Sequence, residues 1–208
     1  MLKYYEVEGW IHLDHGDSYE LVASCLDAGF DSVMIDASES SFEENVRISS
    51  EVVKTAAPYN ANVEAELGYV AKLGQKQSPP EFSSSSECKK FVEATGINAL
   101  AVAIGNAHGF YKSTPQLRFD VLQQISDVVS IPLVLHGSSG IPESDLQKAI
   151  QTGICKINLA TEIKNIFMKK LQSILSETNE IDLRIVFPKA TEAARDLLIQ
   201  KFNYINEA

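Results

Sequence analysis

Short apolar strands alternate with helical segments along this chain, and that alternation limits the folds it can adopt. Strands are expected at residues 10–14, 32–36, 62–67, 99–104, 132–135 and 155–159. Helices are expected at residues 17–28, 41–57, 86–95, 116–128, 142–153, 160–175 and 188–204. Several strands are almost wholly apolar, which is typical of strands that are covered on both faces. The pattern predicts a parallel sheet with helical crossovers.

Local signals give the expected ends of some helices. Asp17 with Glu20 forms a candidate capping pair for the first helix, and residues 41–44 (SFEE) form a capping box for the second. Pro142 is expected to be the first residue of its helix, where a missing N–H has no cost. The last helix is expected to begin at about Pro188. Residues 1–9 resemble the last turns of a helix that stops at a glycine.

Polar and glycine-rich segments follow the strands, as they do at the active-site end of a (β/α)₈ barrel. About six strand–helix units can be counted, whereas a closed barrel needs eight and typically about 250 residues. We therefore expect an α/β fold, a (β/α)₈ TIM barrel that is N-terminally truncated, in a single domain spanning residues 1–208. Residues 68–86 form a long polar loop, which is expected to be functional, for instance as a lid.

Three of the four histidines lie where a predicted strand stops. They are His15, His108 and His136. The carboxyl ends of parallel strands lie at one edge, so these imidazoles could hold Zn²⁺ and leave a coordination position open. The alternative is that each histidine only forms hydrogen bonds at the start of its loop. The fourth histidine, His12, lies within a strand and is assigned a structural role.

Acidic side chains accompany the histidines. Asp14 precedes His15 and could transfer a proton to a forming or breaking alkoxide. Glu64 and Glu66 share one face of their strand, and with Asp36 they form either a second cation site or a buried hydrogen-bonded network. Lys156 could form a Schiff base, but it begins its predicted strand, away from the site, and is assigned a structural role.

Two small-residue segments follow the last two predicted strands. Residues 137–140 (GSSG) and 158–161 (NLAT) lie where barrels often bind phosphate through backbone N–H groups. Thr161 opens a helix whose N-terminus favours an anion. The alternative is that both segments are ordinary loops.

Composition excludes several classes of partner. The net charge of −10 and the pI of about 4.9 argue against nucleic acid and anionic membranes, because both require a basic face. The three cysteines have no C-x-x-C spacing, so we expect a reducing compartment, the cytoplasm, rather than a disulfide framework. We expect neither a secretory signal nor a membrane-spanning segment.

Five segments together resemble the zinc-dependent class II ketose-bisphosphate aldolases, which include fructose- and tagatose-bisphosphate aldolases. The segments are HLDHG, VEAELG, AVAIGNAHGFY, PLVLHGSSGIP and KINLAT, in family order between about residues 10 and 166. The resemblance implies reversible cleavage of a ketose 1,6-bisphosphate to dihydroxyacetone phosphate and an aldehyde phosphate, a lyase reaction of carbohydrate metabolism such as glycolysis. We also expect a homo-oligomer, a dimer or a tetramer.

The resemblance also implies roles for individual residues. Asp14 would be the catalytic proton donor, and the zinc ligands would be His15, His108 and His136. Asp36 and Glu66 match second divalent-cation positions, and a monovalent cation (Na⁺ or K⁺) is often found near the phosphate site. The positions that match dihydroxyacetone phosphate binding are Gly109, Gly137, Ser138, Ser139, Asn158, Ala160 and Thr161.

The chain departs from the family pattern in three places. Two βα units that precede HLDHG in the family are not in this sequence. The segment after VEAELG reads YVAKLGQKQS, without the usual carboxylates. A C-terminal arginine that holds the distal phosphate in some members is replaced in residues 186–189, where Lys189 would offer only a point charge. The alternative function is therefore a non-catalytic remnant or partner subunit that keeps the binding surface.

Overall fold

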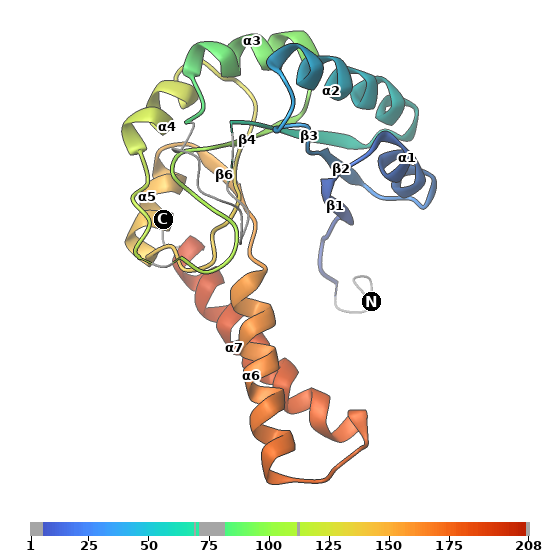
Figure 1. Ribbon diagram of the computed structural model, residues 1–208, viewed down its shortest axis with the longest axis vertical. Helices are drawn as coiled ribbons and strands as arrows, with labels where there is room; N and C mark the ends of the chain where they lie inside the picture. The colour runs from blue at the N-terminus through green and yellow to red at the C-terminus, as the bar shows by residue number, and fades with distance from the viewer. Residues whose placement is uncertain (1–5, 69, 71–81, 112, 207–208) are drawn as a thin grey trace.

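The computed structural model describes residues 6–68, 70, 82–111 and 113–206. Over these residues the strands form one parallel sheet in chain order, and the sheet curves as half of a barrel (Figure 1). The strands are β1 (His12–Gly16), β2 (Ser32–Ile35), β3 (Asn62–Leu67), β4 (Ala99–Val102), β5 (Leu133–Leu135) and β6 (Ile154–Ile157). The predicted α/β fold with a parallel sheet is confirmed.

A helix follows each strand. The helices are α1 (Tyr19–Asp27), α2 (Phe42–Ala56) with a 3₁₀ turn (Ala57–Tyr59), α3 (Ser85–Thr95), α4 (Phe119–Ser126), α5 (Glu143–Gln151), α6 (Thr161–Glu177) and α7 (Leu183–Asn206). Figure 1 shows α1 to α5 along the outer side of the sheet, whereas α6 and α7 project from it as a hairpin. None of the described helices combines the length and apolar composition needed to cross a bilayer.

The two faces of the sheet bury different side chains because successive residues of a strand point to opposite sides. On β2, Val33 and Ile35 belong to the large core between the sheet and the helices. Met34 points to the inner face instead, where it packs with Ala101 and Val134 in a small second cluster. The inner face also carries polar residues of β1, β3 and β6, which contribute to the site described below.

Some predicted element ends are confirmed. The strand over residues 62–67 has the predicted bounds. Ser41 caps α2, since its side chain accepts a hydrogen bond from the Glu44 N–H. Gly96 follows α3 with a φ of 71°, a left-handed conformation that suits glycine at a helix end. The predicted loop over residues 68–86 lies mostly outside the described residues.

The predicted caps of two helices are wrong. α1 follows Ser18, not Asp17, and no side chain caps it. The reason is that the Ser18 hydroxyl donates to the Asp17 carboxylate, so these two polar groups satisfy each other. Pro142 is the residue before α5 and not its first residue.

Two predicted helix boundaries are also wrong. α7 begins at Leu183 and contains Pro188. The Asp182 carboxylate accepts a hydrogen bond from the Arg184 N–H at 2.9 Å, so an aspartate cap starts the helix five residues before the proline. The helix end predicted over residues 1–9 is not present at residues 6–9, and residues 1–5 lie outside the described part of the chain.

Candidate metal centre and active site

β1 ends in an irregularity that brings two functional residues to the same edge. Leu13 pairs with Val33 and Gly16 with Ile35, so β1 has one residue more than β2 between these pairs. His15 accordingly has a φ of 57°, a left-handed conformation that costs a non-glycine residue about 1–2 kcal/mol. Such strain is concentrated at functional sites. A bulge of this kind redirects side chains, which lets Asp14 and His15 both reach the mouth of the half-barrel.

Hydrogen bonds connect the loop that carries His108 to the segment just after β5. Asn106 accepts a hydrogen bond from the Ile104 N–H at 2.8 Å and donates to the His136 carbonyl at 3.0 Å. The Tyr111 hydroxyl accepts from the Ala107 N–H at 2.9 Å and donates to the Gly137 carbonyl at 2.8 Å. These four bonds fix the two histidine-bearing segments against each other. Sequence reasoning did not assign roles to Asn106 or Tyr111.

Gly137 is required where these two segments touch. A Cβ on Gly137 would lie 2.2 Å from the Ala107 carbonyl oxygen, and the φ of 63° is left-handed. Gly29 has a φ of 85° but nothing within 4 Å of its Cβ position. Gly137→Ala should therefore lower the free energy of unfolding by about 1–3 kcal/mol more than Gly29→Ala, as overpacking does. Urea unfolding of both variants measures the difference, and equal losses would show that the backbones are not in close contact.

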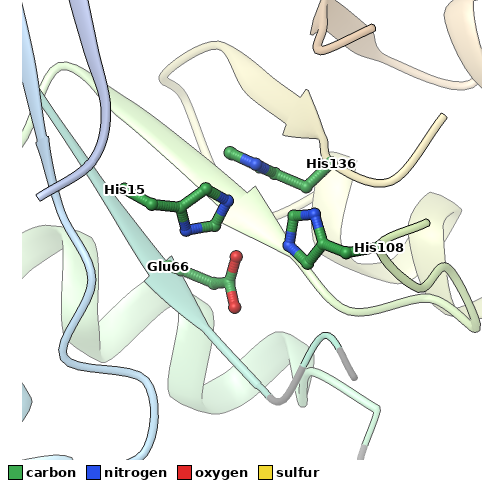
Figure 2. Close-up of side chains that lie close together, drawn as sticks. All are labelled: His15, Glu66, His108 and His136. Atoms are coloured by element: carbon green, nitrogen blue, oxygen red, sulfur yellow. The ribbon is translucent and has the colours of Figure 1, made fainter. Parts of the chain in front are cut away.

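Three imidazoles and one carboxylate converge at the edge of the sheet (Figure 2). The ring centroid of His15 lies 4.7 Å from that of His108 and 4.6 Å from that of His136. The ring centroids of His108 and His136 are 5.8 Å apart. One ligand atom from each of these histidines and one from Glu66 lie within 4.8 Å of one another. The three histidines therefore lie close together, as the sequence pattern predicted.

The cluster has the donor set of a metal site. His15 Nε2 and Glu66 Oε2 are buried and accept or donate no hydrogen bond among the described residues. Buried polar atoms are normally satisfied, so such atoms need a partner. Three imidazole nitrogens and a carboxylate oxygen are ligands that Zn²⁺ accepts. The residues therefore fit a divalent cation.

The second carboxylate, Asp36, lies behind the cluster. One of its oxygens is 2.9 Å from His15 Nδ1, and the other accepts hydrogen bonds from the Ser38 hydroxyl and N–H. A carboxylate in this position orients a metal-binding imidazole, leaving the other ring nitrogen for the ion. Burial lowers the pKa of His15, but the Asp36 hydrogen bond and nearby carboxylates outweigh that effect and raise it.

Burial and the negative charge of Asp36 raise the pKa of Glu66 to about 8. Without a cation, the Glu66 carboxyl therefore gives up its proton less readily than an ordinary glutamate does. A bound cation would compensate the negative charge of these two carboxylates and displace the proton.

Asp14 lies at the mouth of the site, half exposed, with its Oδ1 3.9 Å from both His15 Nε2 and His136 Nδ1. Asn158 Nδ2 donates to the same Oδ1 at 2.9 Å. Asp14 is therefore held beside the cluster without belonging to it. This position suits a group that transfers protons to a molecule bound at the cluster.

Ten of the predicted site residues line one small pocket, with a volume of about 50 Å³. They are Asp14, His15, His108, Gly109, His136, Gly137, Ser139, Asn158, Ala160 and Thr161. Asp36, Glu66 and Ser138 lie outside this lining; Ser138 is fully buried and donates to the Leu135 carbonyl. The structure thus brings most of the residues predicted for the metal and phosphate sites to a common edge.

The N-terminus of α6 is joined to the glycine-rich segment after β5. The Ser139 hydroxyl accepts a hydrogen bond from the Glu162 N–H at 3.2 Å, and the Glu162 carboxylate accepts one from the Gly140 N–H. Glu162 also pairs with Lys201 of α7 at 2.9 Å. The residues before it, Ala160 and Thr161, face the pocket at the start of α6.

A family profile described as fructose-bisphosphate aldolase class-II matches residues 1–208. The chain belongs to the class II fructose-bisphosphate aldolase family. The resemblance stated from the sequence motifs is therefore confirmed. Class II aldolases are metal-dependent lyases, which agrees with a histidine and glutamate cluster that could hold a metal.

Individual members of the family are similar over most of this chain. A fructose-bisphosphate aldolase from Geobacillus stearothermophilus is 44% identical over 92% of this chain and 68% of its own length. One from Staphylococcus epidermidis is 43% identical over 95% of this chain and 71% of its own length.

Solved structures of family members agree with the fold. The YdjI aldolase from Escherichia coli K12 has a TM-score of 0.82 and 38% identity, covering 93% of this chain and 68% of that one. A putative fructose-1,6-biphosphate aldolase from Coccidioides immitis has a TM-score of 0.85 and 30% identity, covering 95% and 71%. The chain thus spans about two thirds of each of these relatives.

The inner face of the sheet holds a polar network that sequence reasoning did not assemble. Lys156 was expected at the start of its strand, away from the site, and that placement is wrong. It is the third residue of β6, and its Nζ lies 2.5 Å from Glu64 Oε2 and 3.1 Å from His12 Nε2. Glu64 Oε1 in turn lies 2.8 Å from His136 Nε2. The strand alternation could have shown these residues on one face, but not their register.

Burial and Lys156 lower the pKa of His12, so this imidazole is neutral at neutral pH. Burial would raise the pKa of Glu64, but the hydrogen bond from His136 and the charge of Lys156 outweigh it and lower the pKa. Glu64 is therefore a buried carboxylate, and Lys156 compensates its charge.

Proposed function

We propose that this protein is a zinc-dependent aldolase that reversibly cleaves a ketose 1,6-bisphosphate, of the fructose or tagatose type. The products would be dihydroxyacetone phosphate and an aldehyde phosphate. The observation that carries this proposal is the convergence of three imidazoles beside a half-exposed aspartate. They come from the end of β1, the loop after β4 and the residue after β5. Membership of the class II aldolase family supports the same reaction.

His15, His108 and His136 are the proposed zinc ligands. Asp36 orients His15 by its hydrogen bond to Nδ1. Asp36 and Glu66 are also the proposed positions for a second divalent cation. Burial and the negative charge of Asp36 raise the pKa of Glu66, so a cation beside these two carboxyls would be stabilised. A zinc ion at this site would supply Lewis-acid stabilisation of negative charge on the substrate oxygens.

Asp14 is the proposed catalytic proton donor. In the cleavage direction its carboxylate takes the proton of the substrate hydroxyl whose carbon becomes the aldehyde, and in the condensation direction the carboxyl returns it to the forming alkoxide. Asn158 holds one Asp14 oxygen at 2.9 Å, which orients the carboxylate toward the pocket.

A phosphate group of the substrate is proposed to bind at the start of α6, where backbone N–H groups and the helix dipole favour an anion. The residues assigned to dihydroxyacetone phosphate are Gly109, Gly137, Ser138, Ser139, Asn158, Ala160 and Thr161. A monovalent cation, Na⁺ or K⁺, is proposed beside this phosphate site.

Residues 1–208 are proposed to form one partial TIM-barrel domain with six of the eight βα units, located in the cytoplasm. The described sheet has six strands in barrel order. The partial length matches the 68–71% of each relative that the chain covers. The cysteines at positions 25, 88 and 155 are free thiols, which suits a reducing compartment.

The proposed homo-oligomer, a dimer or a tetramer, is supported by the hairpin of α6 and α7. Exposed apolar side chains include Ile181 at 91% and Phe202 at 59% of full exposure. Residues 161–208 contain seven Lys or Arg and seven Asp or Glu, so the net charge of −10 lies entirely in residues 1–160. Two hairpins can therefore meet without the repulsion that two acidic bodies would experience.

Light scattering should give a particle mass of two or four chains for the wild-type protein. Phe202→Asp should lower the mass toward the 22.9 kDa of one chain, because it places a charge in the apolar contact. Val128→Asp is the matched control, since Val128 is exposed but lies outside the hairpin. A monomeric wild-type protein at micromolar concentration would contradict the oligomer.

Metal removal tests the proposed function directly. Purified protein should contain about one Zn²⁺ per active chain, and a chelator should abolish cleavage of fructose or tagatose 1,6-bisphosphate in a coupled assay. Adding Zn²⁺ back should restore activity. Cleavage that survives complete removal of metal would refute a zinc-dependent aldolase.

Borohydride distinguishes the remaining alternatives. With substrate present it should trap no adduct, because Lys156 is ion-paired with Glu64 and a Schiff base needs a neutral amine. A trapped Lys156 adduct would identify a Schiff-base aldolase instead. Zinc binding without any turnover would identify the non-catalytic remnant or partner subunit.

A further inference from the structure

A continuous chain of hydrogen bonds crosses the inner face of the sheet and ends at one of the proposed zinc ligands. Ser32 Oγ lies 2.7 Å from His12 Nδ1, and His12 Nε2 lies 3.1 Å from Lys156 Nζ. Lys156 Nζ lies 2.5 Å from Glu64 Oε2, and Glu64 Oε1 lies 2.8 Å from His136 Nε2. Glu64 and His136 are both 2% exposed or less. None of the first four residues lines the pocket at the mouth of the half-barrel.

The hydrogen positions in this chain follow from the chemistry of its members. A lysine ammonium can only donate, so Lys156 donates both to His12 Nε2 and to Glu64 Oε2. A carboxylate paired with an ammonium can only accept, so the bond between Glu64 Oε1 and His136 must carry its hydrogen on His136 Nε2. The neutral His136 ring then has its lone pair on Nδ1.

A second contact, at the other ring nitrogen of His136, indicates the same tautomer. Asn158 Nδ2 donates to the Asp14 carboxylate at 2.9 Å, which fixes the orientation of the Asn158 amide. The same Nδ2 lies 3.4 Å from His136 Nδ1. A nitrogen that faces a donor carries a lone pair, so both sides of the ring agree. His136 Nδ1 is also the ring nitrogen 3.9 Å from Asp14, on the side of the site.

We propose that Glu64, paired with Lys156, is a positioning residue that fixes His136 in the Nε2–H tautomer and so presents the Nδ1 lone pair to the metal centre. This inference rests on the proposed function, which makes His136 a zinc ligand. Outer partners that orient a metal-binding imidazole typically contribute about 10–100-fold to metal affinity. The proposal gives Lys156 and Glu64 a role. This partly buried ion pair does not line the pocket, and it keeps an obligatory hydrogen-bond acceptor behind His136.

Glu64→Gln should reverse the tautomer with almost no change in shape. Lys156 can only donate, so it will hold the glutamine oxygen and leave the amide NH₂ facing His136 Nε2. The ring must then accept at Nε2 and carry its hydrogen on Nδ1, the side of the metal centre. We expect Zn²⁺ affinity to fall about 10–100-fold, measured by competition with a chromophoric chelator.

The double variant Glu64→Gln/Lys156→Met should restore the original state. Without the ammonium, the glutamine amide can turn and offer its oxygen to the hydrogen on His136 Nε2. We expect this variant to recover the Nε2–H tautomer and most of the lost Zn²⁺ affinity. A purely structural role of the ion pair would not produce rescue by removal of its second member. Glu143→Gln, at the start of α5 and outside the site, is the matched control and should change neither quantity.

The tautomer can be read directly in the metal-free protein. With ¹⁵N-labelled histidine, long-range ¹H–¹⁵N correlations distinguish a ring nitrogen that carries hydrogen from one that does not, and the chain has only four histidines. The proposal requires Nε2–H for His136 in the wild type and Nδ1–H in Glu64→Gln. Nδ1–H in the wild type overturns it, and this measurement does not depend on any variant that might fail to fold.

The two proposals fail in different ways. If Zn²⁺ binds but Glu64→Gln changes neither the His136 tautomer nor the affinity, the positioning role is refuted and the aldolase proposal stands. If the tautomer reverses as expected but the wild-type protein binds no Zn²⁺, the positioning of the ring is correct and the proposed function is refuted.

Discussion

Asp14→Asn should lower kcat for ketose bisphosphate cleavage by about 10²–10⁴-fold, the range that a positioned acid–base group contributes. The amide cannot take or return the proton of the substrate hydroxyl. The zinc content should not change, because Asp14 Oδ1 lies 3.9 Å from the nearest His15 and His136 nitrogens and is held by Asn158. Steady-state kinetics with metal analysis of the same sample measures both quantities.

Asp17→Asn is the control for this variant. Asp17 lies three residues along, interacts with Ser18 and does not line the pocket of the metal centre. Its replacement should leave kcat within about twofold, as expected for a surface change. An Asp14→Asn protein with unchanged kcat and full zinc content would show that another group transfers the proton.

His108→Ala should lower Zn²⁺ affinity by more than about 100-fold, because loss of a direct ligand exceeds the effect of losing an outer partner. Removal of the ring leaves two imidazoles and Glu66 in the cluster. The fold should persist because His108 lies in a loop. Asn106 and Tyr111 still hold that loop by hydrogen bonds to the carbonyls that follow β5. Chelator competition gives the affinity, and circular dichroism reports the fold.

Phe110→Ala is the control for His108→Ala. Phe110 lies in the same loop, its side chain is exposed, and it does not line the pocket of the metal centre. Its loss should leave Zn²⁺ affinity unchanged. If the two variants bind Zn²⁺ equally well, His108 is not a ligand and the three-imidazole site is wrong.

Local sequence patterns predicted much of the fold. The periodicities of apolar residues indicated the alternation of strands and helices, and parallel pairing follows from that alternation. Gly96 and the capping box at Ser41 are signals that act within a few residues, and both operate as predicted. The prediction for α7 failed because Pro188 was taken as the helix start, whereas the cap at Asp182 begins it earlier.

The histidines could be placed together from the sequence because the carboxyl ends of parallel strands share one edge. The finer geometry depends on pairing between distant segments. The extra residue in β1 is visible only against β2, and it is this bulge that redirects His15. Glu66 could be read as part of a second cation site or a buried network, and only the folded sheet places it among the imidazoles.

The hydrogen-bonded network behind His136 could not be predicted from the sequence for the same reason. Lys156 and Glu64 are 92 residues apart, and Lys156 and His12 are 144 apart. Their contact depends on the register of β6, β3 and β1 around the curved sheet. The position of Lys156 near the start of its strand does not show that its side chain reaches Glu64 on the inner face.

X-ray absorption spectroscopy at the zinc edge of the zinc-loaded protein tests the central claim most directly. The account predicts three imidazole nitrogens at about 2.0–2.1 Å, with the outer-ring scattering of histidine and no sulfur in the first shell. A Zn–S distance of about 2.3 Å would assign the ion to one of the free cysteines. That result, or fewer than three imidazoles around the ion, would contradict the convergence of His15, His108 and His136 on a single metal.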